Sequence, residues 1–272
     1  MRYDLHVHTH YSDGLHSPKK VIDKARSLGL RGIAITDHDS VMGIEEALSY
    51  SKEFEDFELI PGIELSCIYR DDEVHILGYF IDYKEEKLHN TTQDLRKHRK
   101  IRGKRMVEKL NTFGIAIDFH KIKSDNPNDF VGRVAIAREL ISKGYANNIQ
   151  DAFNKYLNPG RPAFVERYKL AVEDAIKLIK GAGGLAVLAH PGLLKDETSI
   201  DYSIIKGIDG IEAIHSKHTP KEVKAFKEIA RRNNLIATGG SDCHGEYHNG
   251  DILLGKYYTD LDTIKIMKER IK

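Results

Sequence analysis

The sequence predicts an α/β barrel that a helical insertion interrupts. Short apolar runs alternate with amphipathic helical stretches in the first and last parts of the 272-residue chain, which favours a parallel α/β architecture. From roughly residue 85 to residue 167 the chain is mostly helical and charged, with no strong buried strand. We therefore expect residues 1–84 and 168–272 to form one barrel domain, and residues 85–167 to form a helical insertion, or cap.

The first part of the chain shows this alternation most clearly. Ser17 and Pro18 supply an N-cap and a first-turn proline for a helix that Gly29 ends. The expected elements are, in chain order, a strand at 2–7, the helix that starts at Pro18, a strand at 31–36, a helix at 42–56, and strands at 58–67 and 73–80.

The alternation resumes after the insertion, where the apolar run Gly-Leu-Ala-Val-Leu-Ala reads as a buried strand. No internal repeat or low-complexity tract interrupts it. The expected elements are a helix at 171–180, strands at 184–189 and 208–214, a helix at 220–233 and a strand at 235–238.

Composition excludes several classes of protein. Hydrophobic residues make up 40% of the chain and charged residues 31%, which is ordinary for a globular protein. The formal net charge of +1 gives no global argument for a nucleic-acid or membrane partner. No apolar run is long enough to span a bilayer, and Cys67 and Cys243 suggest no disulfide framework. We expect a cytoplasmic protein.

Nine candidate metal ligands are the most informative feature of the chain. They occur in seven short segments, six of which lie on or just after a predicted strand. Catalytic groups of β/α barrels gather at the carboxyl ends of strands, so these side chains are expected to converge at one mouth. The nine residues are His6, His8, Asp13, His38, Glu64, His75, His190, Asp242 and His244.

The type and number of these residues indicate a cluster of metal ions. Histidine and carboxylate ligands without thiolate fit Mn²⁺, Fe²⁺ or Zn²⁺. A catalytic zinc ion takes about three protein ligands, so nine suit two or three ions. Clustered divalent ions usually hydrolyse phosphate esters or amides. A lone buried histidine such as His75 is usually structural, but in company with the other eight residues it reads as a ligand. The sequence therefore predicts a metallohydrolase.

The same segments resemble the PHP (polymerase and histidinol phosphatase) family of metal-dependent hydrolases. The resemblance covers nearly the whole chain and keeps the order of the family motifs. Cys243 is a departure, since it stands where the family pattern leads us to expect an aromatic or larger residue. The matching segments are His6-Val-His8, Ser12-Asp13-Gly14, Thr36-Asp37-His38-Asp39, Gly62-Ile63-Glu64, His75-Ile-Leu-Gly78, Ala189-His190-Pro191 and Gly240-Ser241-Asp242-Cys243-His244-Gly245.

The resemblance implies a distorted (β/α)7, TIM-like barrel with up to three metal ions. It assigns one ion to His6, His8, Glu64 and Asp242. A second ion would share Glu64 and add His75 and His190, and a third would bind to Asp13, His38 and His244. Mn²⁺ is the metal that the resemblance favours, ahead of Fe²⁺ or Zn²⁺.

Within the family, the segment 29–39 and the helical insertion look most like the nucleoside 3′,5′-bisphosphate phosphatases, whose relatives include a 5′→3′ exonuclease of small RNA (RNase AM). This resemblance implies removal of the 3′-phosphate of a nucleotide substrate, with short RNA as a second substrate. From the chemistry of clustered divalent ions we expect attack by a metal-bridging hydroxide, and without a spanning apolar run we expect no membrane partner. Histidinol-phosphate phosphatase is the alternative activity. The alternative from another functional class is a PHP domain that acts as an interaction module and has no catalytic activity.

Candidates outside the ligand set are fewer. His10 and His215 could act on substrate or protonate the leaving group, with an exposed loop residue as the alternative for His10. Arg133 and Arg161, in the insertion, could bind a phosphate in a bidentate fork, with surface ion pairing as the alternative. The basic run 96–105 reads either as a contact to nucleic acid or as a solvated helix face.

Overall fold

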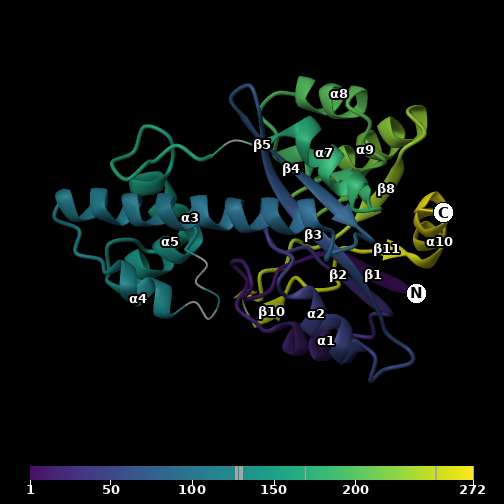
Figure 1. Ribbon diagram of the computed structural model, residues 1–272, viewed down its shortest axis with the longest axis horizontal. Helices are drawn as coiled ribbons and strands as arrows, with labels where there is room; N and C mark the ends of the chain where they lie inside the picture. Colours follow the sequence, from purple (N-terminus) through teal and green to yellow (C-terminus); the bar gives the residue numbers. More distant parts are fainter. Residues whose placement is uncertain (126–127, 129–130, 169, 249, 272) are drawn as a thin grey trace.

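The computed structural model describes residues 1–125, 128, 131–168, 170–248 and 250–271, which form a barrel with a group of helices at one side (Figure 1). The strands of the main sheet are β1 (Arg2–Val7), β2 (Gly32–Ile35), β3 (Glu58–Tyr69), β4 (Asp72–Tyr79), β5 (Leu170–Ala171), β6 (Leu185–Leu188), β7 (Gly210–Ile214), β8 (Ile236–Gly239) and β11 (Thr259–Asp260). A small hairpin joins β9 (Tyr247–His248) to β10 (Asp251–Ile252).

Helices alternate with these strands. They are α1 (Pro18–Ser27), α2 (Ile44–Ser51), α3 (Glu86–Thr112), α4 (Phe119–Ser124), α5 (Arg133–Ser142), α6 (Ile149–Ala152), α7 (Val172–Gly181), α8 (Thr198–Ile205), α9 (Pro220–Arg232) and α10 (Leu261–Ile271), with a π-helical turn at Phe153–Leu157 and a 3₁₀ turn at Pro191–Leu193. The strands and helices predicted outside the insertion are present, while α8 and α10 were not predicted. In the described part of the chain no helix has the length and apolar character needed to cross a membrane.

The main sheet curls into a nearly closed barrel. Seven strands follow one another in the order β1-β2-β3-β4-β6-β7-β8, and β11 pairs with the outer edge of β1. The segment after β8 returns to β1, where Cys243 pairs with Val7 and the His8 amide donates to the Cys243 carbonyl at 3.0 Å. The fold is thus a distorted TIM-like barrel, as predicted.

Strand β4 departs from the all-parallel arrangement that the alternation favours. It runs antiparallel to both β3 and β6, whereas β1, β2 and β3 are mutually parallel. The two-residue turn Arg70–Asp71 joins β3 to β4, with Arg70 at a φ of 53°, and a connection this short forces an antiparallel pair. His75 therefore lies within a long hairpin, opposite Ser66, and not at the carboxyl end of a parallel strand.

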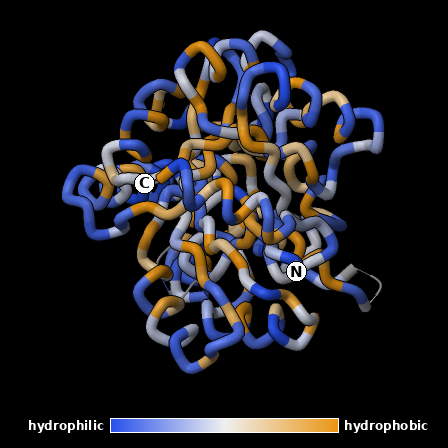
Figure 2. The backbone as a smooth tube through the Cα atoms, turned by 90° about the vertical axis from the view of Figure 1, so that its right-hand side faces the viewer, coloured by the Kyte–Doolittle hydropathy of each residue, from blue (hydrophilic) through white to orange (hydrophobic). Residues whose placement is uncertain are grey.

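The insertion has an apolar core of its own. Buried side chains of α3, α5 and the intervening loops pack together, among them Leu110, Ile117, Ile136 and Leu140. Separate clusters lie between the barrel and its surrounding helices. Figure 2 shows hydrophobic segments gathered in the interior of the barrel, with hydrophilic segments around them, and Figure 1 shows α3 extending from the barrel to α4 and α5.

The basic run of α3 attaches the insertion to the barrel. Arg96 donates to the Tyr11 carbonyl at 2.7 Å and Arg99 pairs with Asp39, both in the barrel. Arg102 donates to the Val165 carbonyl at 2.8 Å and so joins α3 to the end of the insertion itself. These three arginines are three residues apart and share one helix face. At these positions the side chains are structural, which fits neither interpretation of the run offered by the sequence.

Leu110→Ala tests the separate core of the insertion. Leu110 is fully buried in α3, so we expect its truncation to lower the free energy of unfolding by about 2–5 kcal/mol, through lost burial and the cavity left behind. Urea denaturation followed by circular dichroism measures the change. Phe113→Ala, at a side chain that is 61% exposed, is the control and should change it by less than about 0.5 kcal/mol. Equal effects of the two variants would contradict this account.

Candidate metal centre

The first two histidines reach the barrel mouth from one strand. His6 lies in β1 and His8 follows it, and residues i and i+2 of a strand point to the same face. Their rings are 5.2 Å apart between centroids and both are buried. The segment 242–244 after β8 pairs with the end of β1. Asp242 therefore lies close to both rings, with Oδ1 3.1 Å from His8 Nε2.

Glu64 occupies the centre of the cluster. It lies in β3, fully buried, and five histidines from four segments surround its carboxylate. Those near Oε2 are His6 (3.3 Å), His8 (3.3 Å) and His38 (2.9 Å), and those near Oε1 are His75 (2.7 Å) and His190 (3.0 Å). One carboxylate placed between five imidazole rings is suited to bridging two cations.

All nine candidate ligands come together in overlapping groups whose ligand atoms lie within 4.8 Å of one another or contact Glu64. Two four-residue groups share His8, and a further group places His75 with His38 and Glu64. The four-residue groups are His6, His8, Glu64 and Asp242, and His8, Asp13, His38 and His244. The first group has the same members as the first site assigned by family resemblance, and the second adds His8 to the third site.

Buried atoms without hydrogen-bond partners test whether metal ions fit here. Within the described residues, eight ring or carboxylate atoms of this region are buried and make no hydrogen bond. Each such atom costs about 1–3 kcal/mol when it has no partner. The atoms are His6 Nε2, His8 Nδ1, Asp13 Oδ1, His38 Nδ1, Glu64 Oε2, His75 Nε2, His190 Nδ1 and His215 Nε2. Divalent cations would pair with such a donor set, so the residues fit a metal cluster.

The carboxylates give the cluster a strong preference for positive charge. Burial opposes ionisation of Glu64, but the nearby His38, His75 and His6 lower its pKa well below the usual range. Burial also opposes protonation of His75, yet Glu64 and Glu73 raise its pKa to about 9. Conversely, burial and the neighbouring His244 lower the pKa of His8 to about 4. The carboxylates thus stay ionised and attract cations.

Glu212, in β7, positions one of the ligands. Its carboxylate is fully buried and accepts from His6 Nδ1 at 3.0 Å and from the His190 amide at 2.8 Å. His6 Nε2 is thereby directed at Glu64 and Asp242. Such a carboxylate–histidine pair fixes the tautomer and ring orientation of a metal ligand. The sequence reasoning missed Glu212, although an acidic residue inside the apolar run Gly-Ile-Glu-Ala-Ile was an available signal.

Two neighbouring aspartates hold the loops around the cluster. Asp37 accepts from the Thr9 amide at 2.7 Å and from Ser12 Oγ at 2.5 Å. Asp39 accepts from the Ser66 amide at 2.9 Å and pairs with Arg99. Positive φ values occur at Asp39, and at the candidate ligands His190 and Asp242, which is backbone strain of the kind that gathers at functional sites.

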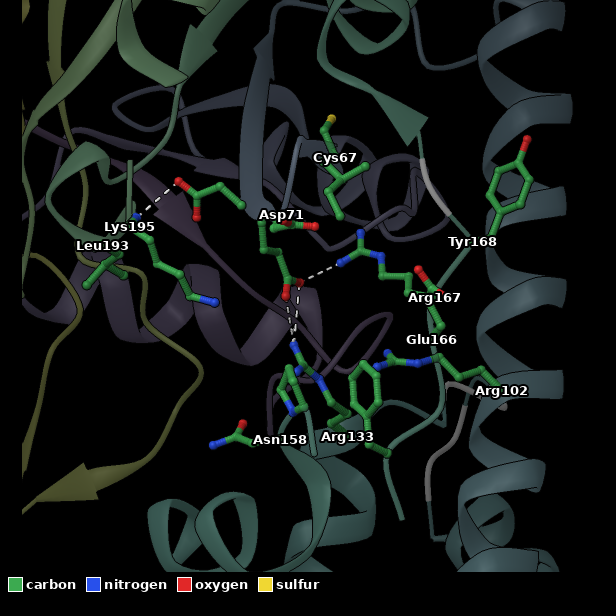
Figure 3. A pocket seen from close by; sticks show the side chains of 15 residues that line it. Cys67, Asp71, Arg102, Arg133, Asn158, Glu166, Arg167, Tyr168, Leu193 and Lys195 are labelled. Atoms are coloured by element: carbon green, nitrogen blue, oxygen red, sulfur yellow. Dashed lines mark hydrogen bonds and ion pairs between the residues drawn. The ribbon is translucent and has the colours of Figure 1, made fainter. Parts of the chain in front are cut away.

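A cavity of about 520 Å³ adjoins the cluster on the side of His75, and we call it the arginine cavity. Figure 3 shows Arg133 and Arg167 directed at the same carboxylate, which belongs to Glu73. The distances are 3.2 Å from Arg133 Nη2 and 2.6 Å from Arg167 Nη1. Glu73 Oε1 is also 3.5 Å from His75 Nε2. Arg102 and Lys195 line the same cavity together with the acidic residues Asp71, Asp72 and Glu166. Because two guanidinium groups share the single carboxylate of Glu73, an anion could bind to them in its place.

The remaining predicted residues lie at different distances from the cluster. His215 is fully buried beneath it, with Nε2 3.5 Å from Asp242 Oδ2. His10 is half-buried and lines a second cavity. Arg133 lines the arginine cavity, but Arg161 is exposed and is not among the described residues that line it. Arg167, which sequence reasoning did not select, occupies the place expected for Arg161.

Comparisons with known proteins identify the family of this chain. The PHP domain model matches residues 4–183. A 3′,5′-nucleoside bisphosphate phosphatase from Chromobacterium violaceum is 34% identical over 255 residues, which cover 91% of this chain and 88% of that protein. A 5′-3′ exoribonuclease from Haemophilus influenzae is 34% identical over 274 residues, covering 97% and 96%. The crystal structure of a predicted metal-dependent phosphoesterase from Bifidobacterium adolescentis superposes with a TM-score of 0.89 at 32% identity, covering 98% and 96%. The chain belongs to the PHP family.

Proposed function

We propose that the protein is a metal-dependent phosphatase that removes the 3′-phosphate from nucleoside 3′,5′-bisphosphates and also trims short 5′-phosphorylated RNA from its 5′ end. The observation that carries the proposal is the arginine cavity beside the ligand cluster. Both reactions place a nucleotide 5′-phosphate near the scissile bond, and Arg133 and Arg167 are placed to bind it. The names of the bisphosphate phosphatase and exoribonuclease relatives support the same substrate class.

Two or three divalent ions, with Mn²⁺ preferred, are the proposed cofactors. His6, His8, Glu64 and Asp242 would hold one of them. Glu64, His75 and His190 would hold a second, and Asp13, His38 and His244 a third. Such ions lower the pKa of bound water into the neutral range and offset charge on phosphoryl oxygens.

The protein's own residues orient the reactants. Glu212 holds the His6 ring, and His215 supports Asp242 from beneath. Arg133 and Arg167 exchange Glu73 for the 5′-phosphate, because guanidinium groups bind a phosphate in a bidentate fork. Residues 85–167 act as the cap that carries Arg133 over the barrel mouth, while Arg167 extends from its end.

A phosphate-release screen tests the function. The substrates are adenosine 3′,5′-bisphosphate, a 5′-phosphorylated oligoribonucleotide and histidinol phosphate, each with Mn²⁺ added after removal of bound metal by a chelator. We expect release from the bisphosphate to depend on Mn²⁺, and shortening of the RNA to yield mononucleotides. Preference for histidinol phosphate would replace the proposal by the alternative phosphatase. Inactivity on all three, with no metal bound, would favour a noncatalytic module.

Arg133→Ala and Arg167→Ala test the 5′-phosphate site. Each removes a charged hydrogen-bond donor worth about 1.5–3 kcal/mol, so kcat/KM on the bisphosphate should fall roughly 10- to 150-fold. Adenosine 3′-monophosphate, which lacks the 5′-phosphate, should be affected much less. Arg161→Ala, at the exposed arginine of the neighbouring loop, is the matched control and should keep the parent rates. Loss of activity in the Arg161 variant alone would restore the sequence-based assignment.

Glu212→Gln tests the support of His6. The amide keeps the shape of the carboxylate but removes the charge that fixes the His6 ring, so we expect metal affinity to fall about 10- to 100-fold. Calorimetric titration of Mn²⁺ into the metal-free protein measures this directly. Glu228→Gln, on the exposed face of α9, is the control. Unchanged Mn²⁺ affinity in the Glu212 variant would show that the pair with His6 is only structural.

A further inference from the structure

A second cavity, of about 380 Å³, lies on another side of the ligand cluster. Its lining comes from the loop after β1 and from α4 and α5, and it includes His10, Leu15, Lys121, Arg138 and Ser142. Arg138 Nη2 donates to the Asp13 carbonyl at 3.0 Å, which ties the wall of the cavity to a candidate ligand segment. The volume falls in the range of small-molecule sites, about 300–1,000 Å³.

Helix α5 connects the two cavities across the barrel mouth. Its first residue, Arg133, lines the arginine cavity and reaches His75 through Glu73. Arg138, further along the same helix, borders the second cavity and contacts Asp13. Among the described residues, none lines both cavities, and His75 and Asp13 belong to different candidate ligand groups that meet at His38. The two cavities thus contact the cluster through different ligand groups.

The cations of the second cavity are paired one to one with carboxylates. Lys121 Nζ is 3.0 Å from Glu139 Oε2 and Arg138 Nη2 is 3.1 Å from Glu246 Oε1, whereas Arg133 and Arg167 of the arginine cavity share Glu73. Asp125 adds a further acidic group, while Leu15 and Ile122 supply apolar surface. A cavity with balanced charge, hydrogen-bonding groups and apolar walls suits the ribose and base of a nucleoside better than a second phosphate.

We propose that this cavity binds the nucleoside on the 3′ side of the scissile phosphate, so that short RNA spans both cavities while a bisphosphate fills only the first. The inference rests on the proposed function and deepens it. In the reaction, the oxygen of water adds to phosphorus and the bond from phosphorus to the 3′ oxygen breaks. The 3′ oxygen leaves with a proton, and the downstream nucleoside keeps the phosphate as its new 5′-phosphate.

Blocking the second cavity from an exposed position tests the proposal. Ser142 lies at the last residue of α5 and is exposed, so Ser142→Trp should fold while filling the cavity, and Ser142→Ala is the matched control. The substrates are adenosine 3′,5′-bisphosphate and a 5′-phosphorylated diadenosine. We expect Ser142→Trp to lower kcat/KM on the dinucleotide at least about 10-fold and to change the bisphosphate rate by less than about 2-fold.

A second variant and a binding measurement test the assignment of the second cavity independently of Ser142. Lys121→Trp blocks the same cavity from α4 and should reproduce the selective loss. Calorimetry of the metal-free protein with a dinucleotide whose internal linkage is a methylphosphonate should detect weaker binding to both tryptophan variants than to Ser142→Ala.

The possible outcomes separate the two proposals. Equal loss on both substrates, or no loss on either, overturns the assignment of the second cavity but leaves bisphosphate hydrolysis by the parent protein in place. A parent protein that hydrolyses the bisphosphate and not the dinucleotide overturns it as well. A parent protein inactive on both substrates overturns the proposed function itself.

Discussion

The fully buried carboxylate of Glu64 is the constraint on which the rest of the structure depends. An ionised carboxylate inside a protein is stable only when positive charge or hydrogen-bond donors compensate it. Five histidine rings from four segments surround this carboxylate, and His38, His75 and His6 among them lower its pKa. These segments meet only when the barrel is nearly closed. Closure through the pairing of Val7 with Cys243 brings Asp242 beside His8. The ligand cluster and the closed barrel therefore depend on each other.

The antiparallel hairpin of β3 and β4 explains the position of the arginine cavity. In a barrel of parallel strands alone, His75 would follow a strand at the mouth. Here the hairpin places Glu73 two residues before His75 on the same strand face, next to the cap. Arg133 at the start of α5 and Arg167 at the end of the cap then meet at that carboxylate. One hairpin thus links the ligand cluster to the part of the chain that is suited to selecting the substrate.

Sequence reasoning succeeded where the information is local. The spacing of His6 and His8, and the placement of ligand segments after apolar runs, depend only on strand periodicity, and the structure brings all nine residues together. The direction of β4 was not predicted, because it depends on the turn at Arg70, which carries no Gly or Asn signal for positive φ. The sequence could not tell that Arg167, rather than Arg161, lines the arginine cavity, because two arginines six residues apart in an irregular segment differ only in tertiary position. Glu212 was missed for a similar reason, since its partner His6 is more than 200 residues away.

Differences in burial decide which arginines can exchange partners. The pair of Arg99 with Asp39 is buried, with 15% and 3% of the two side chains exposed, and breaking such a pair by removing one partner costs about 3–5 kcal/mol. Glu73 is 42% exposed, but its partners Arg133 and Arg167 are only 23% and 21% exposed, so these pairs lie between the buried pair and fully exposed pairs, which contribute about 0–1 kcal/mol. Under the proposed function, a dianionic phosphate would displace Glu73 from Arg133 and Arg167, and the released carboxylate would gain water. Arg99 would then hold α3 to the barrel through its buried pair with Asp39, while Arg133 and Arg167 would exchange Glu73 for the anion.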